Sequence, residues 1–218
     1  MLTKMEKSQD SFNLLMSKSC SEFSELLAEK ISMPGGGSAA SLTGALGAAL
    51  CSMAANFTIG KKNYEDVQDD VKSILEKSER IRKRFLELAD EDAKAFPELS
   101  AAYKIPKDNP DRDKIYERAA LNACKAPVEM IECCAEAIDL LNEIMQKGNK
   151  MLISDAGCGA LLCKAAMESA AMNVVINTSS LKNCDEARKI ESKIDDIIEK
   201  YSPTASIIAE EVNLYLRK

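Results

Sequence analysis

The stretch PGGGSAASLTGALGAALCSMAA, residues 34–55, decides the fold of this chain. A proline and three glycines break the chain, and a long run of alanine, serine and glycine interspersed with leucine follows them. A glycine inside a helix costs up to about 1 kcal/mol relative to alanine, so Gly44 and Gly47 require a reason. The simplest reason is that another helix approaches closely at both positions. The stretch therefore predicts a packed helix with Ser38 as its N-cap, ending near Ile59.

The rest of the chain also follows helical patterns. A capping box at Ser19–Glu22 begins a first helix that stops before Pro34. Further helical patterns cover residues 64–103, 111–145, 156–178 and 184–216, with a kink expected at Pro127 and an interruption at Ser202-Pro203. We found no period-two alternation and no internal repeat in the sequence. The prediction is an all-α, single-domain bundle of long, partly kinked helices over residues 1–218, with residues 1–18 as a candidate peripheral N-terminal helix.

Composition excludes several classes of function. The chain of 218 residues has a net charge of −6, which gives no general attraction for nucleic-acid phosphates. We expect no membrane span and no signal peptide, and eight cysteines without a C-x-x-C pair are typical of reduced thiols in a cytoplasmic protein. Histidine is absent, so acid–base chemistry must come from Asp, Glu, Lys, Tyr or Cys, and no imidazole can bind a metal.

The loop Pro34–Ser38 is the first candidate site. Three glycines allow a ligand to approach the backbone closely, and the helix that follows offers unpaired N–H groups and a partial positive charge. Such an end suits a carboxylate or a phosphate. The alternative is a flexible turn between two helices, and the residues alone leave both interpretations open.

Asp92 is the second candidate. Steps of three and four from Ile74 place Asp92 on the same stripe as Ile81, Phe85 and other apolar residues. Burial disfavours the charged form of a carboxyl group, so its pKa should rise toward neutrality, as suits a general acid or base. A structural carboxylate bonded to a lysine or a backbone amide is the alternative. The neighbours Asp90 and Glu91 fall off the stripe and should be solvated.

Other polar residues are weaker candidates for a functional site. Asp155 stands at the start of a second helix rich in small residues, where capping is the commoner role. Asn173 and Asn177 interrupt an apolar run and are either structural hydrogen bonders or substrate readers. Lys61 and Tyr64 follow the glycine-rich helix at its far end, as a solvated cap or as contacts for an anionic ligand.

Taken together, these motifs resemble the formiminotransferase-cyclodeaminase C-terminal domain family. The resemblance rests on Pro-Gly-Gly-Gly-Ser-Ala-Ala at 34–40, Gly-Ala-Leu-Gly-Ala-Ala-Leu at 44–50, Asp-Ala-Lys-Ala-Phe at 92–96, Asp-Ala-Gly-Cys-Gly-Ala-Leu at 155–161 and Asn-Val-Val-Ile-Asn at 173–177. The motifs follow in the right order from about residue 19. Glu91 and Cys158 depart from the usual family pattern without affecting the chemistry.

The resemblance implies an all-helical homodimer that binds a tetrahydrofolate derivative and needs no metal or further cofactor. It implies a methenyltetrahydrofolate cyclohydrolase, with formiminotetrahydrofolate cyclodeaminase as the alternative and a non-catalytic dimerisation module as a second one. Asp92, with Asp90 as fallback, is implied as the acid–base group and Asp155 as a second catalytic residue. The substrate-binding residues are then Pro34, Gly35, Gly36, Gly37, Ser38, Lys61, Tyr64 and Asn177.

Overall fold

The structure is a computed structural model, and it describes residues 15–181 and 184–218. Within these ranges every regular element is helical. The candidate N-terminal helix at residues 1–18 lies mostly outside them, and its described part is a single 3-10 turn, η1 (Leu15–Ser17). The α-helices are α2 (Cys20–Ala28), α3 (Gly36–Asn56), α4 (Gln68–Tyr103), α5 (Arg112–Lys147), α6 (Ile153–Thr178) and α7 (Asp185–Leu216), with 3-10 turns η2 (Lys62–Val67) and η3 (Lys150–Leu152) between them.

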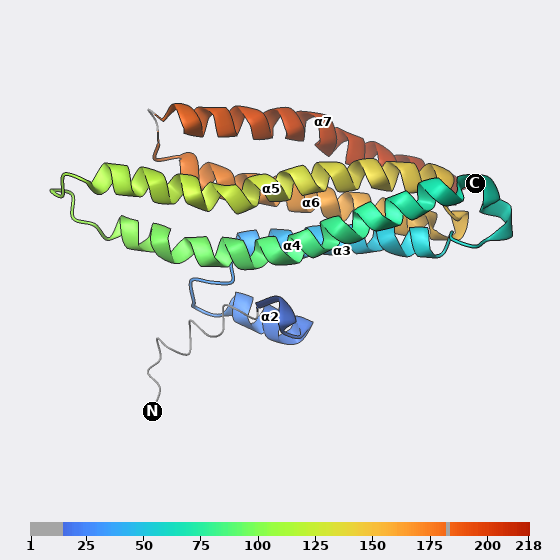
Figure 1. The fold of residues 1–218 in the computed structure, drawn as a ribbon, viewed down its shortest axis with the longest axis horizontal. Helices are drawn as coiled ribbons and strands as arrows, with labels where there is room; N and C mark the ends of the chain where they lie inside the picture. Colours follow the sequence, from blue (N-terminus) through green and yellow to red (C-terminus); the bar gives the residue numbers. More distant parts are fainter. Residues whose placement is uncertain (1–14, 182–183) are drawn as a thin grey trace.

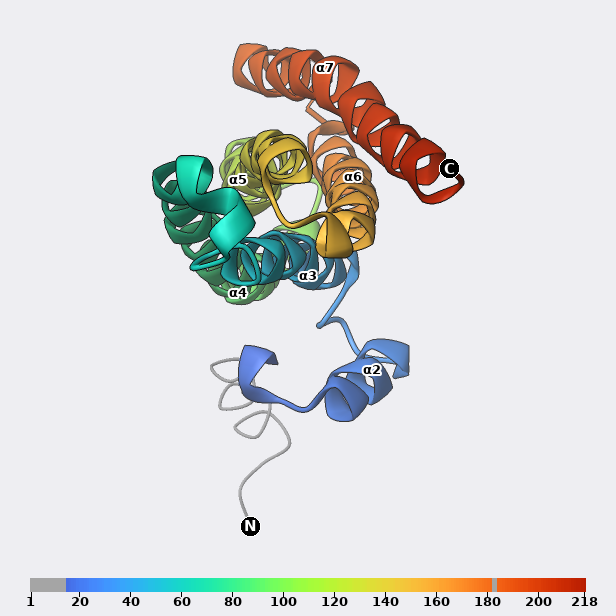
Figure 2. The same ribbon diagram turned by 90° about the vertical axis from the view of Figure 1, so that its right-hand side faces the viewer.

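Four long helices form the body of the molecule. Helices α3, α4, α5 and α6 run side by side, and seen end-on they surround one core (Figures 1 and 2). Helix α7 covers α5 and α6 from outside, whereas α2 lies on the opposite side, beyond α3 and α4. The largest fully buried side chains are aliphatic or aromatic, among them Phe85, Ile138 and Met167. The prediction of an all-α bundle is confirmed.

The glycines of α3 mark the closest helix contacts. A Cβ at Gly44 would lie 2.6 Å from the ring of Phe85 on α4. A Cβ at Gly47 would lie 3.0 Å from the carbonyl oxygen of Gly159 on α6 and would also clash with Cys163. Both glycines therefore permit close helix packing, as the sequence predicted.

Serine side chains also join α3 to α4. The hydroxyl of Ser41 donates to the carbonyl of Phe85, and the hydroxyls of Ser52 and Ser78 lie 2.8 Å apart in the core. Ser38 is fully buried, and its hydroxyl lies 3.4 Å from the carbonyl of Ala89. The prediction that Ser38 is the N-cap of α3 is wrong, because extended Gly35, three residues earlier, holds the cap position and the helix begins at Gly36.

Helix α2 agrees with the sequence prediction, since it begins with the expected capping box of Ser19 and Glu22 and ends at Ala28, before Pro34. One other boundary differs. Helix α7 continues through Pro203 without interruption. A proline removes one backbone hydrogen bond, and in α7 the burial of Ile194, Ala205, Ile208 and Val212 on both sides of Pro203 supports a continuous helix.

Helices α3 and α6 are apolar enough to qualify as membrane spans by length and composition alone. The expectation of no membrane span did not take the length and apolarity of these two helices into account. Core helices of soluble proteins pass the same test, so the finding is weak evidence for a membrane. In this structure α3 is mostly buried against its neighbours, whereas much of α6 is exposed.

Candidate active site

The carboxyl group of Asp92 lies against the start of α3. A Cβ at Gly37 would sit 2.6 Å from the carboxyl carbon of Asp92 and would clash with both carboxyl oxygens. Gly37 is therefore required by close approach of the carboxylate. Both residues belong to the same chain, so the glycine loop and the candidate acid–base group meet within one subunit.

Burial shifts the ionisation of Asp92. The side chain is half-buried, and the loss of solvent raises its pKa to about 6, while the nearby hydroxyl of Ser38 acts in the opposite direction. Burial disfavours the charged form, and a hydroxyl that donates to the carboxylate favours it. A pKa near 6 leaves most of the group ionised at neutral pH and able to accept a proton.

Asn173 completes the site from the side of α6. A Cβ at Gly36 would meet the amide nitrogen of Asn173 at 3.5 Å and its amide oxygen at 3.6 Å. The amide nitrogen donates to the carbonyl of Ser169, which fixes the side chain. Gly36 and Gly37 thus lie between an amide on α6 and a carboxylate on α4. The sequence singled out Asn173 as polar in an apolar run, but the substrate-binding prediction was placed on Asn177.

Asn177 lies one helical turn beyond Asn173 on α6. Its amide nitrogen donates to the carbonyl of Ala123 on α5, at 3.2 Å. This bond ties α6 to α5. The substrate-binding role of Asn177 stays a prediction.

The carboxylates beside Asp92 divide into two kinds. Glu91 is exposed and pairs with Arg84, as expected for a residue off the apolar stripe. Asp90 is half-buried, and its Oδ1 atom is buried without a hydrogen-bond partner in the described part of the chain. Burial raises the pKa of Asp90, while Lys94 lowers it. The expectation that Asp90 is solvated is therefore wrong, but Asp92 is the carboxylate that meets the glycine loop.

Three predicted site residues lie at the other end of the bundle. Lys61 and Tyr64 follow the C-terminus of α3, which spans roughly 30 Å at 1.5 Å per residue. The hydroxyl of Tyr64 accepts a hydrogen bond from the backbone N–H of Lys150, at 3.1 Å. Asp155 is at the N-terminus of α6, and the contact of Gly47 with Gly159 brings that end beside the C-terminal half of α3. Within one chain the structure does not bring these residues to Asp92.

The central site can therefore supply a proton acceptor, an amide and backbone N–H groups. The N-terminus of α3 has no side-chain cap among the described residues, so its first N–H groups are available to an anion or a carbonyl. No group of three metal-binding side chains occurs within residues 15–181 and 184–218. The arrangement suits proton transfer at a cationic or electrophilic carbon held over the loop.

Known proteins share this arrangement of motifs and helices. The profile of the family described as formiminotransferase-cyclodeaminase matches residues 19–196. The chain belongs to the formiminotransferase-cyclodeaminase family. A methenyltetrahydrofolate cyclohydrolase of Methylorubrum extorquens is 42% identical to it over 164 residues, which are 73% of this chain and 78% of that relative.

Other members of the family extend the comparison. The formimidoyltransferase-cyclodeaminase of Rattus norvegicus is 26% identical over 89% of this chain, and the match covers only 37% of that longer relative. The crystal structure of formiminotetrahydrofolate cyclodeaminase from Thermotoga maritima superposes with a TM-score of 0.78 at 30% identity. That match covers 93% of this chain and 97% of the other, so the two folds agree over nearly their whole length.

Proposed function

We propose that this protein is a methenyltetrahydrofolate cyclohydrolase, which converts 5,10-methenyltetrahydrofolate to 10-formyltetrahydrofolate. The observation that carries the proposal is the carboxyl group of Asp92, which has a pKa of about 6 and lies against Gly37. The 42% identity to a relative named for this activity gives the substrate class. The named relatives are all enzymes, which argues against a non-catalytic dimerisation module.

The substrate carbon lies between N5 and N10 in a delocalised amidinium cation. Asp92 accepts a proton from a water molecule as the water oxygen bonds to that carbon, which gives a neutral tetrahedral adduct. The bond from the carbon to N5 then breaks, Asp92 returns its proton to N5, and the hydroxyl proton leaves to solvent. One proton is released per turnover, and the formyl group stays on N10. The negative charge of Asp92 also stabilises the bound cation.

The second candidate is formiminotetrahydrofolate cyclodeaminase activity, supported by the likeness to the Thermotoga maritima structure. The same carboxylate could serve ring closure by N10 with release of ammonia. The test is to give the purified protein each substrate separately. Loss of the near-ultraviolet absorbance of the methenyl compound above the buffer rate identifies the cyclohydrolase. Its appearance, with ammonia, identifies the cyclodeaminase.

Asp92→Asn is the matched variant for both assays. It keeps the size of the side chain and removes the proton acceptor, so a folded variant should lose on the order of 100-fold or more in kcat. Folding is checked by circular dichroism. An Asp92→Asn protein as active as wild type would overturn the assignment, and a wild-type protein inactive on both substrates would overturn the function.

The proposal includes a cytoplasmic homodimer. Helices α3 and α6 pack side by side, yet they leave large apolar side chains in solvent: Leu46 is 51% exposed, Leu161 49%, Met172 72% and Ile176 63%. We infer that these side chains belong to an interaction surface, because large apolar side chains gathered on the outside of two packed helices mark such sites. A second copy of the chain presents the same surface, and a self-complementary apolar patch suits a two-fold dimer.

A further inference from the structure

A cleft of about 650 Å³ lies between the N-terminal segment and the last turns of α4. This volume falls within the range of roughly 300 to 1,000 Å³ that is usual for small-molecule sites. Leu26 on α2 and Pro34 of the glycine loop form one wall, and Phe96 and Ala101 on α4 belong to the other. The lining is mainly apolar. Pro34 is also the first residue of the glycine loop Pro34–Ser38, which contacts Asp92 through Gly37. The cleft and the candidate active site therefore share this loop.

The residues of α4 connect the two places directly. Asp92, Phe96 and Ser100 on α4 and its C-cap residue Lys104 are spaced four apart, and such residues form one slanted ridge on a helix surface. Phe96, Ser100 and Lys104 all line the cleft. The ridge therefore begins at Asp92, the candidate proton acceptor, and runs along the cleft to the positively charged side chain of Lys104. At about 1.5 Å per residue, Lys104 lies roughly 18 Å along the helix from Asp92.

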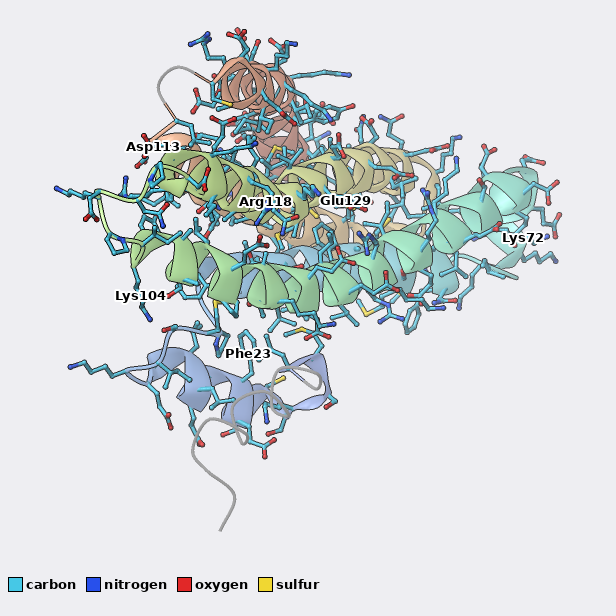
Figure 3. All side chains as sticks on the ribbon, turned by 60° about the vertical axis from the view of Figure 1, so that its left-hand side comes forward. Phe23, Lys72, Lys104, Asp113, Arg118 and Glu129 are labelled. Carbon is cyan, nitrogen blue, oxygen red and sulfur yellow. The ribbon has the colours of Figure 1, made fainter. Side chains whose placement is uncertain are left out.

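The charges of the cleft have one sign. Lys18 and Lys104 line it, and no acidic residue belongs to the lining among the described residues. Lys18 is half-buried, and neither lysine forms an ion pair within residues 15–181 and 184–218. The acid closest in sequence to Lys18 is Glu22, whose carboxylate accepts hydrogen bonds from the backbone N–H and the hydroxyl of Ser19. These bonds, and to a smaller extent the charge of Lys18, lower the pKa of Glu22. Figure 3 shows Lys104 near the end of α4, on the side that faces α2 and Phe23.

We infer that this cleft binds the aminobenzoyl-glutamate part of the folate substrate, an inference that rests on the proposed function. N10, one of the two nitrogens at the reacting carbon, carries a benzoyl ring that ends in a glutamate with two carboxylates. With the reacting carbon at Asp92, the ring packs beside Phe96 in the apolar part of the cleft. The glutamate carboxylates then reach Lys104, near the C-terminal end of α4, and Lys18, which also lines the cleft; neither lysine forms an ion pair among the described residues.

The test compares a lysine double variant with a matched one. In Lys18→Gln/Lys104→Gln we expect the KM for 5,10-methenyltetrahydrofolate to rise about tenfold, as for the loss of 1.4 kcal/mol of binding, with kcat changed less than about twofold. Lys77→Gln/Lys83→Gln makes the same charge change on exposed parts of α4 outside the cleft and should leave KM unchanged. A third variant, Ala101→Trp, narrows the cleft without a charge change and should also raise KM.

A binding measurement separates this inference from the proposed function. Calorimetric titration with 4-aminobenzoyl-glutamate requires no turnover, and wild type should bind it more tightly than 4-aminobenzoate, which lacks the glutamate. The lysine double variant should lose that difference. Failure of wild type to act on the methenyl compound would overturn the proposed function alone. Unchanged KM and unchanged fragment binding in both cleft variants would mean that something else occupies the cleft, and would overturn the inference.

Discussion

Asp92 owes its chemistry to its surroundings. Burial raises its pKa to about 6, so the carboxylate form that accepts a proton predominates only above that pH. We predict that kcat/KM, which reports the ionisation of the free enzyme, rises about tenfold per pH unit below pH 6 and levels off above roughly pH 7. A pH–rate profile of wild type measures this rise, and the residual activity of Asp92→Asn should show no such step. A kcat/KM that is level from about pH 5 to 8 would contradict the role of Asp92 as the base.

The position of that carboxylate depends on Gly37. In Gly37→Ala the new methyl group would overlap the carboxyl group of Asp92, so the side chain must leave its place. We predict a fall in kcat on the order of 100-fold, because small displacements of reacting groups have effects of this size. In Gly36→Ala the methyl group would meet Asn173 at 3.5 Å, an ordinary contact, and the loss of kcat should be much smaller. Equal losses in the two variants would contradict this interpretation.

Individual residues also show how far the sequence can predict the site. Helical periodicity placed Asp92 on the inward stripe, since a carboxylate among Phe85 and Leu88 is conspicuous in the pattern. The choice between Asn173 and Asn177 depends on which turn of α6 meets the glycine loop, and one sequence contains no signal for that register. The pairing of Ser38 with α4 was missed for the same reason. The spacing of apolar residues along one helix predicts which of its faces is buried. Which residues of two helices come into contact depends on the register between the helices, which that spacing does not contain.

At the scale of helices, the α3–α4 contact is close because α3 has no side chain at position 44. Gly44→Ala would gain up to about 1 kcal/mol of helix propensity. The methyl group would, however, lie 2.6 Å from the fully buried ring of Phe85, and overpacking of this kind costs typically 1–3 kcal/mol. The cost of overpacking should exceed the gain in helix propensity. We therefore predict that Gly44→Ala lowers the free energy of unfolding, measured by urea denaturation.

A double-mutant cycle gives the control for this prediction. Phe85→Leu removes ring atoms from the contact and should by itself be destabilising, because it leaves a cavity. Combined with Gly44→Ala it should be less destabilising than the sum of the two single changes, because the added methyl group then has space. If the changes in free energy of unfolding of the two single variants simply add in the double variant, or if Gly44→Ala is more stable than wild type, then α3 and α4 can move apart at this contact without a large cost.

Helix identity was more predictable than helix ends. Apolar periodicity in α4 and α7 is strong enough to predict both helices, and tertiary packing carries α7 through Pro203, where propensity alone suggested a break. The glycines before Ser38 illustrate the reverse case. Their backbones can join the helix or remain in the loop, so the start of α3 at Gly36 is visible only in the structure, where Gly36 and Gly37 pack against Asn173 and Asp92.

At the scale of the whole molecule, α6 has apolar side chains that a single chain leaves exposed to solvent. Leu161, Met172 and Ile176 are separated by whole numbers of helical turns to a first approximation, so they share one exposed stripe of α6. Burying a side chain of this size stabilises an interface by roughly 1.5–3 kcal/mol. In a symmetric dimer both copies would contribute these residues to the interface, so the stabilisation would count twice. The stripe is therefore the strongest candidate contact between copies.

The dimer prediction follows from that stripe. We expect wild type to sediment as a dimer, and Met172→Glu to shift the equilibrium toward monomer, because each interface would then bury two unpaired carboxylates. Ile207→Glu introduces the same charge at an apolar residue of α7 that is 53% exposed and is not part of the stripe, so this variant should remain dimeric. Sedimentation velocity at several concentrations distinguishes the two variants. A Met172→Glu protein that dimerises as tightly as wild type would place the interface elsewhere, whereas monomeric wild type would leave the α3–α6 surface without its proposed partner.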